Sequence, residues 1–120
     1  MTGIDPVLAA SVVGVGGAVG AVGRHAVGLR IDGRRSVVAV NALGSLILGV
    51  VTAAPVGSTL ALFAAVGFCG AFTTFSSVTV ETVSTATDGD ARSAALFAAE
   101  TLVTAVLGFL LGSVAVGLIA

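Results

Sequence analysis

Four apolar segments separated by short polar connectors most constrain what this chain can fold into. They lie at about residues 4–23, 37–54, 59–86 and 94–120. Each is close to or longer than the ~20 residues that an α-helix needs to cross ~30 Å of hydrocarbon. The connectors hold proline, glycine, aspartate and arginine, which are typical of turns at an aqueous boundary. We therefore expect an all-α membrane protein in which residues 1–120 form a single domain of four transmembrane helices.

The scarcity of charge supports a lipid environment and excludes several classes of function. Only 9% of the residues are charged, whereas soluble domains average about 25%. The net charge is −1, and no basic patch is present to neutralise phosphates, so we expect no nucleic-acid partner. The single cysteine, Cys69, excludes an internal disulfide and is expected to be a small buried side chain. No nucleophile, base and orienting group occur as a set, which argues against an enzyme.

The arginines are confined to one side of the expected bundle. With four spans, the first and third connectors lie on one side of the membrane, and the termini and second connector lie on the other. The positive-inside rule then places the first and third connectors in the cytoplasm and the termini outside. All five arginines fall on that first side: Arg24, Arg30, Arg34, Arg35 and Arg92.

A stretch rich in glycine and hydroxyl groups interrupts the third segment at residues 67–77, GFCGAFTTFSS. Gly67 and Gly70 would each cost a continuous helix about 1 kcal/mol relative to alanine. One interpretation is a helix broken between Gly67 and Thr74, whose freed carbonyls could coordinate a cation and whose freed N–H groups could face an anion. Such irregular backbone requires protein, water or an ion to satisfy it at membrane depth. The other interpretation is a continuous helix whose hydroxyls form an inward polar face.

Other polar side chains fall inside the apolar segments, and each allows two interpretations. Asn41 is either a hydrogen-bonding contact between helices or a donor that lines a pore. Thr101 and Thr104 allow the same two roles. Glu81 and Glu100 are functional candidates as intramembrane carboxylates, yet both lie within one or two turns of the third connector and suit the interface equally well. The residue types alone leave both roles open for each of them.

Three motifs resemble the Fluc/CrcB family of small fluoride channels, and the resemblance extends along the entire chain. The motifs are GGAVGAVGR at residues 16–24, NALGSLILG at 41–49 and GFCGAFTTFSS at 67–77. The third motif is the most specific of them. The resemblance implies a passive channel that exports fluoride from the cytoplasm and lowers its toxicity. It also implies an antiparallel dimer of four-helix subunits in the cell membrane, with the third helix broken and two pores.

The resemblance also assigns roles to individual residues. A structural sodium ion, Na+, at the dimer centre would be held by the backbone carbonyls of Gly70 and Thr73. Asn41 would be the pore asparagine, and Phe75 the first of the family's two pore phenylalanines. The remaining positions carried over are Ser76 and Thr101 along the pore, and Arg24 and Glu81 as structural or interfacial residues.

The chain departs from the family pattern in its pore residues and in its charge balance. The second pore phenylalanine is Val78 here, and the expected pore line of the fourth helix is Phe97, Thr101 and Ala105, of which only Thr101 is polar. One pore is therefore expected to be altered. Arginines on a single side favour one fixed orientation. This bias suggests a heterodimer with a paralogous subunit of opposite orientation, with a homodimer as the alternative.

Two other classes of membrane protein fit parts of the pattern. Small multidrug exporters are also four-helix chains, but they need a carboxylate within the first helix, whereas Asp5 stands at its very start. A non-conducting or half-conducting subunit of a heterodimeric fluoride channel is the second alternative. Fluoride efflux measured with and without a partner chain would separate this subunit from a complete channel.

Overall fold

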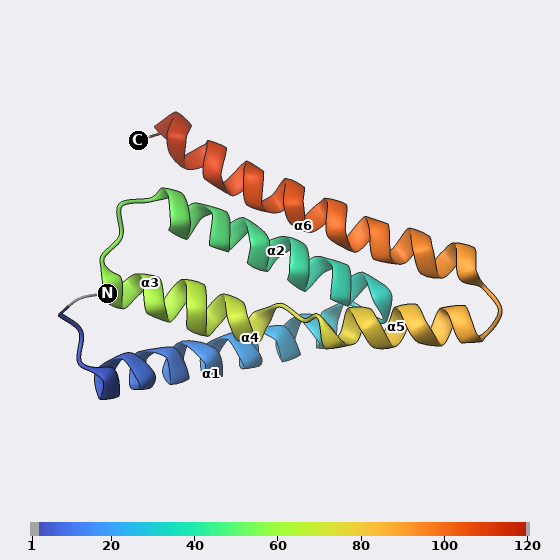
Figure 1. The fold of residues 1–120 in the computed structure, drawn as a ribbon, viewed down its shortest axis with the longest axis horizontal. Helices are drawn as coiled ribbons and strands as arrows, with labels where there is room; N and C mark the ends of the chain where they lie inside the picture. The colour runs from blue at the N-terminus through green and yellow to red at the C-terminus, as the bar shows by residue number, and fades with distance from the viewer. Residues whose placement is uncertain (1–2, 120) are drawn as a thin grey trace.

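The computed structural model describes residues 3–119 and contains four helical spans, each running opposite to the one before it (Figure 1). The third span is composite, with a short α3, a π-helical segment η1, a single turn α4 and a longer α5. All four spans are long and apolar enough to cross a membrane, and residues 3–119 contain no strand. The expected all-α class and the four spans are therefore confirmed. The elements are α1 (Pro6–Arg30), α2 (Arg34–Ala53), α3 (Ser58–Ala61), η1 (Leu62–Cys69), α4 (Gly70–Phe72), α5 (Ser76–Thr87) and α6 (Ala91–Ile119).

The first helix extends further toward the connector than the sequence suggested. It continues to Arg30 instead of ending near residue 23, because residues 24–30 contain no proline and remain compatible with a helix. Ile31 still donates its N–H to Val27 O at 2.9 Å. The first connector is therefore reduced to residues 31–33, where Gly33 takes the positive φ of 64° that favours glycine.

The second and fourth spans also begin earlier than expected. α2 starts at Arg34 instead of residue 37, and α6 starts at Ala91 instead of residue 94. Asp90 caps α6, since its Oδ1 accepts the N–H of Ser93 at 3.0 Å. This backbone hydrogen bond, reinforced by the Ser93 side chain, lowers the pKa of the Asp90 carboxyl below its usual value.

The first and third spans pack through close backbone contacts at glycines. Gly16 and Gly20 of α1 are buried, and a Cβ atom at either position would collide with the carbonyl of Phe63 or of Phe68 in η1. The contact is reciprocal, because a Cβ at Gly67 would lie 2.6 Å from a backbone oxygen of α1. Glycines four residues apart on α1 thus meet carbonyls five residues apart on η1, which is the hydrogen-bond spacing of a π-helix. Small residues allow this close approach in a membrane, where the hydrophobic effect does not drive helices together.

The second and fourth spans form the other closely packed pair, with α6 lying along α2 (Figure 1). A Cβ atom at Gly108 would lie 2.7 Å from Ala42 O, and Gly49 and Gly112 likewise face the backbone of the opposite helix. These contacts explain why glycine occupies positions in the middle of otherwise regular helices. The bundle is therefore two glycine-packed pairs of spans, joined along α5 and α6 and along α2 and η1.

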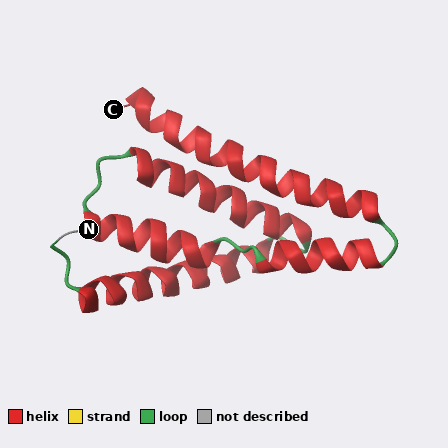
Figure 2. Ribbon diagram, viewed as in Figure 1, coloured by secondary structure: helices red, strands yellow, loops and turns green. Residues whose placement is uncertain are grey.

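The third span is interrupted near its middle, where Figure 2 shows a loop between two helical stretches. α4 ends at Phe72, and Thr73 adopts an extended conformation with φ −80° and ψ 165° before α5 begins at Ser76. The interpretation as a continuous helix with a polar face is therefore wrong. Gly67 and Gly70, which mark the expected break, remain helical, so the interruption lies at the hydroxyl-rich end of the motif.

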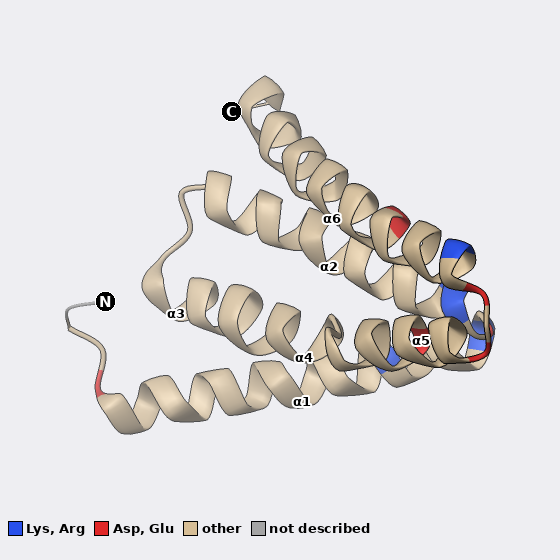
Figure 3. Cartoon of the chain, turned by 45° about the vertical axis from the view of Figure 1, so that its right-hand side comes forward, with Lys and Arg blue, Asp and Glu red and all other residues tan. Residues whose placement is uncertain are grey.

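Most of the charged residues lie toward one end of the bundle (Figure 3). This is the end formed by the first and third connectors, whose arginines stand among the aspartates of the same loops. Asp5 stands at the opposite end, where it caps α1 by accepting the N–H of Val7 at 2.7 Å. The arginines therefore lie at the same end of the bundle, as the sequence predicted. Which end faces the cytoplasm remains a prediction.

Candidate functional site

The interruption of the third span is held by the side chain of Asn41 from α2. Asn41 Nδ2 donates to Thr74 O at 3.0 Å, and Thr74 N–H donates to Asn41 Oδ1 at 2.7 Å. Both residues are buried, with exposed fractions of 8% and 6%. One amide group therefore satisfies both backbone groups of a residue that has left the helix at membrane depth. Of the two roles left open for Asn41, the hydrogen-bonding contact between spans is present.

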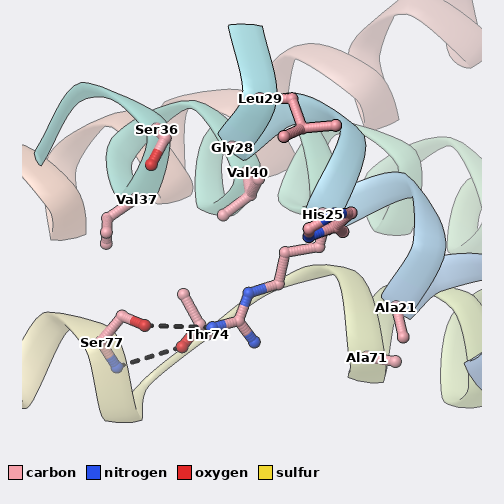
Figure 4. Close-up of a pocket in the computed structure, with 11 residues that line it drawn as sticks. Ala21, His25, Gly28, Leu29, Ser36, Val37, Val40, Ala71, Thr74 and Ser77 are labelled. Atoms are coloured by element: carbon pink, nitrogen blue, oxygen red, sulfur yellow. Dashed lines mark hydrogen bonds between the residues drawn. The ribbon is translucent and has the colours of Figure 1, made fainter. Parts of the chain in front are cut away.

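The helix after the interruption begins with a cap from Thr74. Its Oγ1 accepts the N–H of Ser77 at 3.1 Å, as an N-cap hydroxyl does. Arg24 Nη2, from α1, donates to Ser77 Oγ at 3.0 Å, so Ser77 links the start of α5 to an arginine (Figure 4). These groups line a cavity of about 460 Å³ whose wall also includes His25 and Ser36. The guanidinium and hydroxyl groups make this wall suited to a small anion.

The two carbonyls expected to hold sodium are released by the same interruption. In a continuous α-helix, the N–H groups of Thr74 and Ser77 would bond the carbonyls of Gly70 and Thr73. Asn41 takes the first of these donors and the Thr74 hydroxyl takes the second. Carbonyl oxygens are the donors that alkali cations accept in place of water. The donor set therefore fits a sodium ion, and the described residues offer no cluster of His, Cys, Asp and Glu as a competing metal site.

A groove of about 600 Å³ lies between α2, the interruption and α6. The groove lies beside the interruption, and its lining includes both polar and apolar residues. Ser76 does not line it, and the Ser76 hydroxyl instead lies 3.4 Å from Thr74 Oγ1. Its wall brings together five of the predicted site residues, Asn41, Gly70, Thr73, Phe75 and Thr101, together with Val78 and Ala105.

Two residues of this groove have features that packing within one chain does not explain. Phe75 is 83% exposed although it follows directly on the buried Thr74. Thr101 is only 6% exposed, and its Oγ1 has no hydrogen-bond partner among residues 3–119. Thr104, by contrast, bonds the carbonyl of Glu100 at 2.8 Å and so has an ordinary role within its helix. An unpaired buried hydroxyl requires an explanation, and a ligand in the groove would supply one.

Arg34, which no sequence pattern singled out, organises the charged end of the third span. Its Nε lies 3.3 Å from Glu81 Oε2, and its Nη2 donates to Thr85 Oγ1. Its guanidinium also lies over the ring of Phe97, 5.4 Å from the centroid. Phe97 therefore packs beneath Arg34 and does not line the groove, and its expected place on the pore line stays a prediction.

Thr74 and Ser77 are the other residues that the sequence pattern did not assign. Their spacing of three residues is that of an N-cap hydroxyl and its N–H donor, which was the available signal. The spacing of Glu81 and Thr85 likewise placed these two on one face of a helix. Neither spacing could indicate which residue of another span would meet that face.

The sequence matches the family model described as CrcB-like protein, Camphor Resistance (CrcB), over residues 11–117. A relative from Natronomonas pharaonis, named fluoride-specific ion channel FluC 2, is 53% identical over 88% of this chain and 91% of its own length. A protein of the same name from Haloarcula marismortui is 44% identical over 82% and 86%. The fluoride-specific ion channel FluC of Thermus thermophilus is 36% identical over 88% and 94%.

These relatives are named as ion channels and cover most of the chain, which confirms that the chain is not an enzyme. The family model covers residues 11–117, a range that takes in most of each span, Asn41 and residues 67–77. The chain belongs to the CrcB family.

Proposed function

We propose that this chain forms a passive, fluoride-selective channel that releases fluoride from the cytoplasm. The names of the relatives support fluoride as the ion. The observation that carries the proposal is the convergence of Asn41, Phe75 and Thr101 on one groove at the interruption. Each offers a neutral, electropositive edge and none offers a full charge, which is a chemistry suited to an anion that must be released again.

Each of these three groups has a hydrogen left to offer. An amide carries two N–H hydrogens, and Thr74 O accepts from the Asn41 nitrogen through one of them. The ring edge of Phe75 is the positive part of its quadrupole, and the ring is free of contacts that would bury it. The hydroxyl of Thr101 has no partner within the described chain. Neutral donors replace part of the water around a fluoride ion without holding the ion as firmly as a buried guanidinium would.

The position of the groove supports a second subunit. The groove holds polar backbone and hydroxyl groups at membrane depth, where contact with lipid leaves them unsatisfied. An antiparallel partner placed over the exposed Phe75 would close the groove into a pore. A homodimer and a heterodimer with a paralogous subunit both achieve this closure. The gathering of all five arginines at one end favours the heterodimer, because a chain with this bias inserts in one orientation.

The released carbonyls of Gly70 and Thr73, from both subunits, would hold a structural sodium ion at the dimer centre. Bound there, sodium supplies a fixed positive charge that lowers the cost of an anion in the low-dielectric interior. The residues of this chain then perform the remaining tasks. Asn41 holds the interruption in place, and the groove guides the anion past Phe75 and Thr101.

The proposal is tested by reconstituting the purified chain into liposomes loaded with potassium fluoride and following efflux with a fluoride electrode. We expect fluoride efflux that exceeds chloride efflux under the same gradient, and a loss of efflux when sodium is replaced by a large organic cation. Chain that is dimeric and folded yet releases no fluoride, alone or with a paralogous partner, would refute the channel. Efflux only with the partner would identify the chain as one half of a heterodimer.

A further inference from the structure

We propose that Arg34 shields the anion path from the carboxylate of Glu81, and that this shielding, more than packing, is its contribution to conduction. The inference deepens the proposed function and rests on it. It concerns the charged end of the third span, where an anion would approach the interruption from the first and third connectors.

One face of α5 carries a stripe of polar residues from the interruption to the third connector. Ser77, Glu81 and Thr85 are spaced by four residues, so they follow one another along the same side of the helix, and Thr74 stands before them at the interruption. Thr74 and Thr85 at its two ends are buried, which places the stripe against the neighbouring spans. The stripe is therefore the polar seam along which α5 meets α1 and α2.

Two arginines from different spans contact this stripe at successive turns. Arg24 of α1 donates to Ser77 Oγ at 3.0 Å. Arg34 of α2 contacts Glu81 Oε2 at 3.3 Å and donates to Thr85. Each turn of the stripe after the cap is thus met by a guanidinium, although only one of these turns carries a carboxylate.

The carboxylate stands close to the cavity at the charged end, which shares Thr74 with the groove and would be the anion's approach to that groove. Ser77 and Arg24 line that cavity, and Glu81 follows Ser77 by one helical turn, about 6 Å along the axis. A carboxylate at such a distance repels an approaching anion, because at low salt the screening length is about 30 Å. Pairing with Arg34 turns the charge into a short dipole, whose field falls off faster with distance than that of a lone charge.

The geometry of the pair favours this electrostatic role over a stabilising one. The side chains of Arg34 and Glu81 are 39% and 40% exposed, and ion pairs this accessible contribute little to stability. The guanidinium is nevertheless held in place, since it also lies over the Phe97 ring and bonds Thr85. Contacts with Glu81, Thr85 and Phe97 therefore hold the guanidinium beside the carboxylate.

The test is a double-mutant cycle on fluoride efflux from liposomes, in the assembly for which wild-type efflux has been recorded. Arg34→Gln, Glu81→Gln and the double variant are compared, with Arg35→Gln as the matched control, since Arg35 is the next residue and contacts no carboxylate in residues 3–119. Sodium is kept constant while an impermeant salt sets the ionic strength.

The expected result has three parts. Arg34→Gln lowers efflux about three- to tenfold at about 10 mM ionic strength, and the loss shrinks at about 0.5 M, where screening is short. On the Glu81→Gln background, the same substitution changes efflux less than about twofold, because no charge is left to unmask. Arg35→Gln has a smaller effect than Arg34→Gln at low salt.

Several outcomes would overturn the inference while leaving the channel intact. An equal loss of efflux from Arg34→Gln with and without Glu81, or a loss insensitive to salt, would show that Arg34 acts by packing. Should Arg34→Gln fail to assemble, Arg34→Lys carries the test, since it keeps the charge but loses the planar stacking on Phe97; a large loss for this variant would also overturn the inference. A wild-type protein that releases no fluoride would refute the proposed function itself.

Discussion

Replacing Asn41 by leucine is the substitution whose effect the structure specifies most completely. Leucine has a similar size but removes both the donor to Thr74 O and the acceptor for Thr74 N–H. Each buried backbone group left unpaired costs about 1–3 kcal/mol, so the sum is about 2–6 kcal/mol. Hydrogen bonds between membrane helices average only about 0.6 kcal/mol in cycles where the unfolded chain finds other partners. We therefore expect a loss of about 2–4 kcal/mol in the free energy of unfolding.

The measurement is equilibrium unfolding in mixed micelles, combined with hydrogen exchange at the Thr74 amide. Exchange at that amide should accelerate roughly 30- to 1,000-fold, the factor that corresponds to the lost stability. Ser45→Ala is the matched control, because Ser45 lies one turn further along α2 on the same groove and its hydroxyl forms no hydrogen bond within the described chain. The reasoning would be refuted if Asn41→Leu destabilised the protein no more than Ser45→Ala, or if Thr74 exchange stayed unchanged.

Two further substitutions separate packing from ion binding. Gly67→Ala should lower stability by about 1–3 kcal/mol, since its Cβ would lie 2.6 Å from Val13 O. Gly14→Ala has open space around it and should be neutral or slightly stabilising in the same unfolding assay. Equal effects of the two substitutions would contradict the backbone contact between α1 and η1. Thr101→Val removes a buried hydroxyl without a partner in residues 3–119, so stability should stay level or rise by about 1 kcal/mol while fluoride efflux falls about tenfold. Thr101→Ser should keep the efflux, and an unchanged efflux in Thr101→Val would remove Thr101 from the pore.

The features that depend on local composition could be predicted from the sequence. The four spans follow from the length of the apolar segments, and the interruption follows from a cluster of hydroxyls and glycines at membrane depth. Glycines four residues apart, such as Gly16 with Gly20 and Gly108 with Gly112, have the spacing at which membrane helices approach closely, and both pairs lie at such contacts. Asn41, Phe75 and Thr101, which the family resemblance assigned to a pore, line one groove, and their role in a pore stays a prediction.

The features that depend on contacts between distant residues could not be predicted in the same way. The glycines suggested a break from residue 67 onward, yet Gly67 and Gly70 stay helical. Gly67 packs against the backbone of α1, and Gly70 has open space around it. The chain leaves the helix where Asn41, 33 residues away, takes the Thr74 groups. Arg34 reaches Glu81 across 47 residues, and no local spacing encodes that pairing.

The position of the interruption follows from how differently its two sides are held. The part before it, η1 and α4, packs against α1 through backbone contacts at Gly16 and Gly20. The part after it, α5, packs against α6 and is tied to α1 and α2 by Arg24 and Arg34. The interruption lies between these two sets of contacts. Asn41 stabilises this bend by hydrogen bonding to the N–H and carbonyl of Thr74. As a consequence, the carbonyls of residues 70 and 73 lose their helical donors.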